Sequence, residues 1–317
     1  MNRAHDPRRP LREVESALRC PACSADPSSG AELVVTDDGS SLICASSHRF
    51  DVARQGYVSL LDGRATPHRS DTAAMVAARR RVHESGLFDP VARLVADGVT
   101  AGPVPSSDRS DITTGRPDLV LDAGAGTGHY LSATLDAADE LHGIGLDLSK
   151  YCARAVARSH PRAAAVVADV WRPLPIRSGV IGAVLSVFSP RNVAEFARVL
   201  HPDGVLIVVT PDDDHLTEII GPMGMLSVAD DKAQRLRSSL GGLFEVTDER
   251  PARYRYDADT ALLADLVAMG PSAFHLSDDE IARAAQAMTR TTGRVPVTVS
   301  VTAAICRPRI GAAVTEG

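Results

Sequence analysis

The sequence predicts a doubly wound α/β domain with a mostly parallel sheet, preceded by a small zinc-ribbon-like module. Two observations predict this architecture. Between residues 117 and 210, short apolar runs of strand length alternate with amphipathic segments of helix length, which is the pattern of repeated β-α-β units. Near the N-terminus, two closely spaced pairs of metal-ligand residues are typical of a zinc module. These residues are Cys20, Cys23, Cys44 and His48.

Length, charge and cysteine content limit the kind of protein. The 317 residues are enough for two domains. The net charge of −6 argues against a wholly basic nucleic-acid binder, although local arginine clusters still attract phosphate. No apolar run has the length that spans a bilayer, and no secretory signal is visible, so no membrane partner is expected. Five cysteines do not make a disulfide scaffold in so long a chain, which favours a reducing, cytoplasmic setting.

Composition and spacing divide the chain into four expected regions. These are a basic arm at 1–17, the zinc module at 18–62, bridging helices and a linker at 63–116, and the main domain at 117–317. The arm is expected to be mobile. The bridging region predicts two helices broken near Gly86, and its Gly- and Pro-rich end, 100–116, predicts a flexible loop.

The zinc module combines its ligand pairs with a predicted hairpin. The spacing is C-x2-C-x20-C-x3-H, and strands at 32–36 and 41–44, joined by a turn, would bring the two pairs together. Cysteine-rich sites in a reducing compartment favour zinc, and four protein ligands leave no open position, so one structural zinc ion is expected. The alternative is a set of buried free thiols beside a surface histidine.

The main domain is predicted element by element from its periodicity. Expected strands are 119–122, 141–147, 163–168, 180–187 and 204–210, with helices at 130–138, 149–159 and 193–200 between them. The tail predicts short strands at 244–246 and 254–256, helices at 259–269 and 277–289, and a final strand at 295–305.

A glycine loop follows the first of these strands. Asp122 ends the strand, and glycines then stand at alternate positions, which differs from the dinucleotide G-x-G-x-x-G pattern and lets a ligand approach the backbone closely. Asp147 ends the second strand, where a carboxylate accepts ribose hydroxyls, and Asp169 follows the third, where such folds hold an adenine amino group. This combination predicts a Rossmann-like S-adenosylmethionine (SAM)-dependent methyltransferase; a nicotinamide enzyme is the competing interpretation. The loop glycines are Gly124, Gly126 and Gly128.

Several runs together resemble the 23S rRNA (guanine-N1)-methyltransferase family, one branch of which confers macrolide resistance. In the N-terminal part they are Cys20-Pro-x-Cys23, Cys44-x3-His48-Arg-Phe50-Asp51, Asp71-x3-Met75-x2-Ala78-Arg79-Arg80 and Gly86-x-Phe88-x-Pro90. Farther along they are Gly145-Leu-Asp147-x-Ser149-Lys150, Phe188-Ser-Pro190 and Thr210-Pro211-x3-His215-Leu216. The resemblance is close from about residue 18 to 225 and looser beyond.

The resemblance implies methyl transfer from SAM to N1 of a guanine in a domain II hairpin of 23S rRNA, near the peptide exit tunnel. It also implies which residues contact SAM: Phe88, the glycine loop with His129 and Tyr130, Asp147 and His215. Phe88 stands where the family often has tyrosine, so stacking is kept and a hydroxyl hydrogen bond is lost.

The methyl acceptor has its own candidate residues. Phe188, Ser189 and Pro190 follow the fourth strand, where related folds place the target base. Basic side chains are candidates for phosphate contacts: Arg49, Arg54, Arg64, Arg69, Arg79, Arg80 and Arg81. No residue is identified as a general base, although His215 and the acidic run 212–214 lie near the right strand end.

Two other functions stay open at this point. One is a small-molecule SAM methyltransferase whose zinc module is purely structural. The other is a non-catalytic RNA-binding protein, against which the intact glycine loop argues. The sequence does not distinguish neighbouring guanines of one hairpin, a housekeeping from a resistance role, or a monomer from a homodimer.

Overall fold

The structure is a computed structural model that describes residues 8–23, 31–101, 117–225 and 238–309. Most of the flexible loop expected at 100–116, and the first residues of the expected arm, lie outside these ranges.

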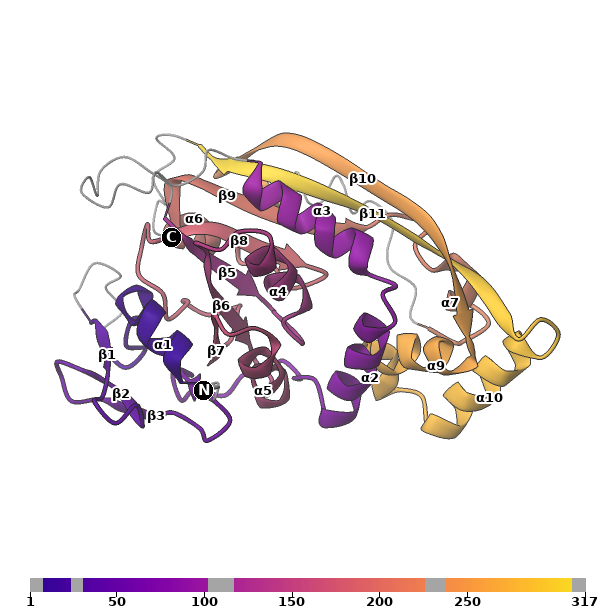
Figure 1. Ribbon diagram of the computed structural model, residues 1–317, viewed down its shortest axis with the longest axis horizontal. Coiled ribbons are helices and arrows are strands. Elements are labelled where there is room, and N and C mark those ends of the chain that lie inside the picture. Colours follow the sequence, from indigo (N-terminus) through magenta and orange to yellow (C-terminus); the bar gives the residue numbers. More distant parts are fainter. Residues whose placement is uncertain (1–7, 24–30, 102–116, 226–237, 310–317) are drawn as a thin grey trace, which may run out of the picture.

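An eight-stranded sheet forms the centre of the molecule (Figure 1). Its strands are β4 (Tyr57–Ser59), β5 (Leu119–Ala123), β6 (His142–Asp147), β7 (Ala163–Val167), β8 (Ile181–Val187), β9 (Leu200–Pro211), β10 (Phe244–Asp259) and β11 (Arg294–Pro308). The spatial order is β10-β11-β9-β8-β5-β6-β7-β4. Pairs from β9 to β4 are parallel, whereas β11 is antiparallel to both β9 and β10. The predicted doubly wound sheet is therefore confirmed.

Helices cover both faces of this sheet, so the central strands are buried on both sides. The helices concerned are α3 (Asp89–Thr100), α4 (His129–Asp136), α5 (Lys150–Ser159) and α6 (Val193–Val199). Val91, Leu131 and Val156 bring α3, α4 and α5 into one apolar core. On the opposite face Phe196 of α6 belongs to a second core.

The N-terminal segment corrects the expectation of a mobile arm. Residues 8–17 form helix α1 (Arg9–Val14) and a 3-10 turn, η1 (Glu15–Ala17), instead of a solvated tail. Leu11 and Val14 are fully buried in the same core as Phe196. The arginines of this segment drew attention to its charge, but its apolar residues are spaced three apart, so they form one buried helix face.

The zinc module contains a small antiparallel sheet of β1 (Leu33–Val35), β2 (Ser41–Cys44) and β3 (Arg49–Asp51). The strand that follows it, β4, leaves this sheet and pairs in parallel with β7 at the edge of the central sheet. Three residues are too few to show a period, so periodicity did not predict this strand.

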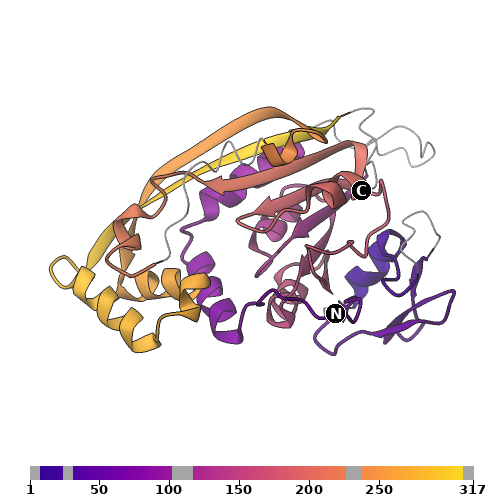
Figure 2. The same ribbon diagram turned by 180° about the vertical axis from the view of Figure 1, so that it is seen from behind.

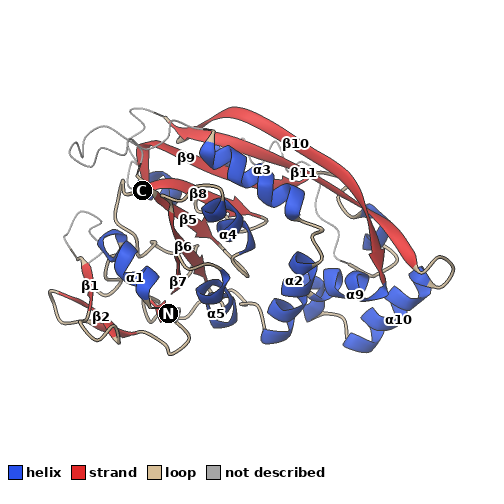
Figure 3. Cartoon of the chain, in the orientation of Figure 1, coloured by secondary structure: helices blue, strands red, loops and turns tan. Residues whose placement is uncertain are grey.

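The C-terminal part forms a long hairpin (Figure 3). β10 is one strand of 16 residues where the sequence predicted two short ones, and Pro251 within it is tolerated because β10 lies at the sheet edge. The hairpin reaches to α9 (Thr260–Ala268) and α10 (Asp278–Thr289), of which α9 packs against both α10 and α2 (Ala73–Glu84). Seen from behind, these helices and the zinc module lie at opposite ends of the molecule (Figure 2). Two further short helices among the described residues are α7 (Thr217–Ile220) and η2 (Pro271–Phe274).

Candidate methyltransferase site and zinc site

The four predicted metal ligands converge. Their ligand atoms all lie within 4.8 Å of one another. Cys23 Sγ is 3.5 Å from Cys44 Sγ, and His48 Nδ1 is 3.2 Å from Cys23 Sγ and 3.4 Å from Cys44 Sγ. Tetrahedral zinc with ordinary bond lengths separates its ligand atoms by about 3.5–3.8 Å. Cys20, the fourth ligand, has its Sγ 3.7 Å from the same nitrogen. These residues fit a closed zinc site, as predicted.

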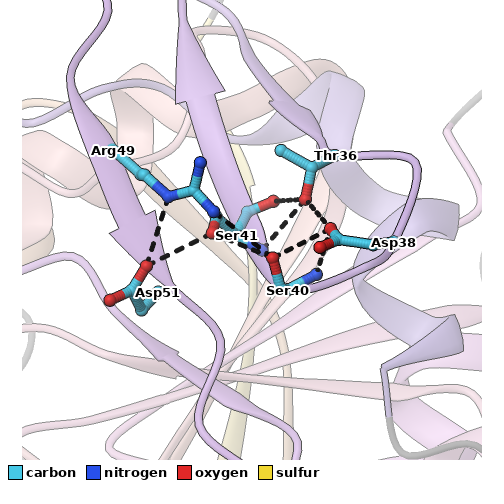
Figure 4. A network of polar contacts seen from close by, with 6 residues as sticks. All are labelled: Thr36, Asp38, Ser40, Ser41, Arg49 and Asp51. Atoms are coloured by element: carbon cyan, nitrogen blue, oxygen red, sulfur yellow. Dashed lines mark hydrogen bonds and ion pairs between the residues drawn. The ribbon is translucent and has the colours of Figure 1, made fainter.

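Hydrogen bonds hold the hairpin beside this site (Figure 4). Asp38 accepts hydrogen bonds from Thr36 Oγ1 and from the backbone and hydroxyl of Ser40. These bonds lower the pKa of Asp38 well below its usual value. Arg49, a candidate for phosphate contact, donates to Asp51 and to Ser40, yet its side chain is 53% exposed. The turn is therefore ordered, and Arg49 still faces solvent.

The glycine loop joins β5 to α4 and is attached to the end of β6. Asp147 accepts hydrogen bonds from Gly126 N at 2.9 Å and from Ser149 N at 2.8 Å. Gly124 has φ of +86°. A Cβ there would lie 2.6 Å from Ser189 Cβ, so the loop leaves no room for a side chain. The glycine-loop residues and Asp147, predicted from strand ends far apart in sequence, thus lie together.

Two buried carboxylates at this edge of the sheet have unsatisfied oxygens. Among the described residues, neither Asp122 Oδ2 nor Asp169 Oδ2 has a hydrogen-bond partner. Burial, followed by the nearby charge of Asp147, raises the pKa of Asp122 to about 7. A buried acceptor without a donor is costly, so these positions suit a ligand that carries N–H groups. The ammonium and the adenine amino group of SAM are such donors, and the residues present therefore fit this cofactor.

Aromatic rings gather beside the loop. The ring centroid of Phe188 lies 5.8 Å from those of Phe88 and His215, and 6.3 Å from that of Tyr130. Phe188 has φ of +51° and is 41% exposed. A non-glycine residue in this backbone region is strained, and such strain is concentrated at functional sites. The structure thus places Phe188, predicted to hold the target base, next to the predicted SAM contacts Phe88 and His215.

Hydrogen bonds to β11 limit what the polar groups near Phe188 can do. The Nδ1 atom of His215 accepts a hydrogen bond from Ser300 N at 3.3 Å. In the neutral ring the proton is therefore on Nε2, which makes that nitrogen a donor. Asp212 accepts from the hydroxyls of Ser300 and Thr302. Both candidates are engaged with β11, which favours positioning over proton abstraction.

The three consecutive arginines of α2 do not form one basic cluster. Arg79 donates to Asp71 and to the carbonyl of Met269. Arg81 forms a two-point contact with Asp265, and Arg80 pairs with Glu84 at the exposed surface. Successive helix residues point about 100° apart, so each arginine faces a different neighbour. The three arginines therefore do not present one joint basic surface, and phosphate contact by each of them stays a prediction.

Arg79 instead lies over the glycine loop. Its Nη1 atom is 3.1 Å from the position that a Cβ on Gly126 would occupy. Its side chain is 22% exposed, and the neighbouring Asp71 and Asp147 help to raise its pKa against the effect of burial. Arg79 therefore lies beside the predicted cofactor loop, and its predicted phosphate contact stays a prediction. The sequence signal for this placement is Asp71, which lies eight residues earlier in the same motif, just before α2, and pairs with Arg79.

The other arginines proposed for phosphate contact lie at or near the zinc module. Arg54 and Arg64 are exposed, and Arg69, also exposed, lies over the ring of Phe274 at 5.5 Å. Among the described residues, no helix has the length and apolar character that crossing a membrane requires.

These features define the class of protein: a SAM-dependent methyltransferase domain that carries an N-terminal zinc ribbon. A family model described as RlmA, N-terminal, matches residues 18–64, and one described as a methyltransferase domain matches residues 120–204.

Curated relatives identify the family more specifically than these two family models do. The chain is 41% identical over 297 residues to a 23S rRNA (guanine(748)-N(1))-methyltransferase of Streptomyces fradiae, covering 94% of this chain and 99% of the relative. It is 41% identical to a putative 23S rRNA (guanine-N(1)-)-methyltransferase of Micromonospora griseorubida, covering 92% and 97%. A putative enzyme of the same kind from Bacillus subtilis is 32% identical, covering 84% and 90%. The chain belongs to the 23S rRNA (guanine-N1)-methyltransferase family.

Proposed function

We propose that this protein transfers a methyl group from SAM to N1 of one guanine in a domain II hairpin of 23S rRNA. The observation that carries the proposal is 41% identity, over nearly the whole of both chains, to the Streptomyces fradiae enzyme. That relative's name numbers its target guanine 748, and we propose the same guanine here. The converged zinc ligands and the glycine loop support the proposal, because both parts of the predicted machinery are assembled.

Residues at the ends of β5, β6 and β7 would hold the cofactor. Asp147 would accept the ribose hydroxyls, Asp169 the adenine amino group, and Asp122 the ammonium group. Arg79, the guanidinium over the loop, would pair with the carboxylate of the methionine part. When bound, SAM supplies an electrophilic methyl group on its sulfonium.

The aromatic residues would position the acceptor. N1 of a paired guanine is inaccessible, so the base must be unpaired or flipped out before transfer. Phe188 is exposed and close to Phe88, which suits stacking on such a base. The Nε2–H of His215 would donate a hydrogen bond at this position, and the ring of Tyr130 would support Phe188 through their edge-to-face contact. Holding N1 in line with the methyl group is then the principal contribution of these side chains.

The zinc ribbon would recognise the RNA hairpin, with Arg49, Arg54, Arg64 and Arg69 as phosphate contacts. All four are exposed. A protein recognises paired RNA mainly through its shape and backbone, for which basic side chains on a rigid metal-folded module are suited. The zinc ion would be structural, since its four ligands leave no open position.

The first experiment is methyl transfer from labelled SAM to 23S rRNA that lacks the modification. N1-methylguanine blocks base pairing, so reverse transcription should stop at a single guanine of the domain II hairpin. No incorporation by protein that holds zinc and binds SAM would overturn the rRNA assignment. It would favour the small-molecule methyltransferase with a structural zinc module.

Two further properties follow from the same proposal, and a third is independent of it. Methylation in the exit tunnel region would raise the inhibitory concentration of tylosin-type macrolides in a sensitive host that expresses the protein. An rRNA substrate places the enzyme in the cytoplasm. A homodimer stays a prediction, which light scattering of the purified protein would test.

A further inference from the structure

A cleft between α2 and α5 contains none of Asp122, Asp147, Asp169 and Phe188, although His129, which the family resemblance assigns to SAM, lines it. Its volume is about 790 Å³. Its walls are α2 and α5, and its floor is the end of the glycine loop with the first turn of α4. Residues that matter for its chemistry are Arg80, His83, Thr127, Ser132, Arg154 and Arg158.

The rim of the cleft is positively charged. Arg154 and Arg158 come from α5 and Arg80 from α2, whereas Glu84 is the one carboxylate in the lining. Among the described residues, Arg154 and Arg158 form no ion pair. Together with Lys150 they stand four residues apart, so three cations follow one face of α5. Glu84 pairs with Arg80 at 3.2 Å across exposed side chains, a contact that a stronger anion readily replaces.

The floor of the cleft is polar and uncharged. The rings of His83 and His129 stack with centroids 4.2 Å apart, and His83 Nδ1 is 2.7 Å from Thr127 Oγ1. Burial, followed by the charges of His129 and Arg79, lowers the pKa of His83 to about 2, so it stays neutral. Among the described residues, Ser132 Oγ is buried without a hydrogen-bond partner. Cations at the rim and hydroxyl and imidazole groups at the floor match a phosphodiester with its ribose hydroxyl.

The cleft and the methyl-transfer position lie on the two sides of one loop. Gly124 faces Ser189 at the aromatic cluster, whereas Thr127 and His129 form part of the cleft floor. Ring contacts continue from His129 through Tyr130 to Phe188, with centroids 5.2 Å and 6.3 Å apart. An RNA strand whose target base lies on Phe188 therefore has a basic channel close to its flanking nucleotides.

We propose that the α2–α5 cleft binds the sugar–phosphate backbone of the substrate RNA beside the target guanine, with Arg80, Arg154 and Arg158 as phosphate ligands. This inference rests on the proposed rRNA substrate. It adds a contact region on α2 and α5 to the one proposed on the zinc ribbon, and α5 itself contacts β4 of the zinc module. Its function is to hold the flanking strand while the target base is unpaired.

The test uses the full-length protein with both arginines of α5 reversed, Arg154→Glu and Arg158→Glu. Binding to a domain II hairpin RNA is measured at several salt concentrations, and SAM binding is measured by calorimetry. We expect the dissociation constant for RNA to rise at least ~10-fold and the slope of log K against log salt to become shallower by about 2, because two phosphate contacts are lost. SAM affinity should be unchanged within about twofold.

A matched control separates site binding from bulk charge. Arg283→Glu on α10 and Arg290→Glu at its C-cap change the net charge equally at exposed positions outside the cleft lining, and RNA binding should stay near the wild-type value. If the α5 variant does not fold, Arg154→Gln with Arg158→Gln replaces it.

Three results would overturn the inference. They are an unchanged salt slope in the α5 variant, equal weakening in the α10 control, or loss of SAM binding with RNA binding intact. Each of these results overturns the inference only when the wild-type protein methylates rRNA. Failure of the wild-type protein to methylate rRNA is a different outcome, which overturns the proposed function itself.

Discussion

Replacing Arg79 with glutamine should weaken SAM binding specifically through the carboxylate of SAM. The guanidinium packs on Gly126 and is held by Asp71 and by the carbonyl of Met269. A charge-assisted hydrogen bond contributes about 1.5–3 kcal/mol, which corresponds to a loss of affinity of roughly 10- to 150-fold. Loss of the ion pair to Asp71, whose side chain is 23% exposed, should also reduce the free energy of unfolding by about 1–3 kcal/mol.

The assay compares two ligands by calorimetry. SAM and decarboxylated SAM share the sulfonium, the ammonium and the adenosine, so they differ only in the group that Arg79 is expected to bind. In wild-type protein SAM should bind more tightly than decarboxylated SAM, and in Arg79→Gln the difference should disappear. Arg79→Lys should restore part of it, because the charge returns without the planar fork.

Arg81→Gln is the matched control for this experiment. Arg81 lies on the same helix and forms a two-point contact with Asp265, but its partners lie on α9 rather than on the glycine loop. The Arg81→Gln variant should be less stable than the wild type and should still bind SAM more tightly than decarboxylated SAM. Equal weakening of both ligands by Arg79→Gln would refute the reasoning, because Arg79 would then act only by holding the loop.

Three more predictions concern the zinc site, Asp122 and Phe188. Cys44→Ser should leave the protein without stoichiometric zinc by elemental analysis and should melt the ribbon first, seen as a new low-temperature transition in calorimetry. The pKa of Asp122 is about 7 in the folded chain and lower when unfolded, so folded protein retains a proton that unfolded protein has released. Stability of the SAM-free protein should therefore fall as pH rises from about 4 to 7, by on the order of 4 kcal/mol from this group. Denaturant unfolding of Asp122→Asn across that range should lack this decline; an unchanged pH profile would contradict the assignment. Phe188→Ala should lower kcat/KM for RNA about 10- to 100-fold through lost stacking, while calorimetry shows unchanged SAM affinity. A matching loss of SAM affinity would instead place Phe188 at the cofactor.

Local sequence patterns predicted much of the fold, because the residues that identify a strand or a helix are neighbours in the sequence. Strands β5, β7 and β8 are apolar runs bounded by turns, so their residue types identify them as strands before their partners are known. The long hairpin shows the limit of this reasoning. Residues 247–253 of β10 are mostly polar and include proline, so they predict a break; pairing with β11 makes them one strand. Likewise β4 becomes a strand only beside β7, about a hundred residues away.

The sequence by itself determined the chemistry of the protein. The features that predict ligands are all short-range. They are the spacing of three cysteines and a histidine, the glycine loop and the acidic strand ends, and the residue types in each one indicate which ligand it suits. Tertiary structure decided what the charged residues contact. Arg79, Arg80 and Arg81 are adjacent in sequence, yet they face the glycine loop, the α5 cleft and α9, because helix geometry separates them and partners from distant elements meet each one. Tertiary structure also determines which ring nitrogen of neutral His215 carries the proton. The backbone N–H of Ser300 in β11, 85 residues farther along the chain, donates to Nδ1.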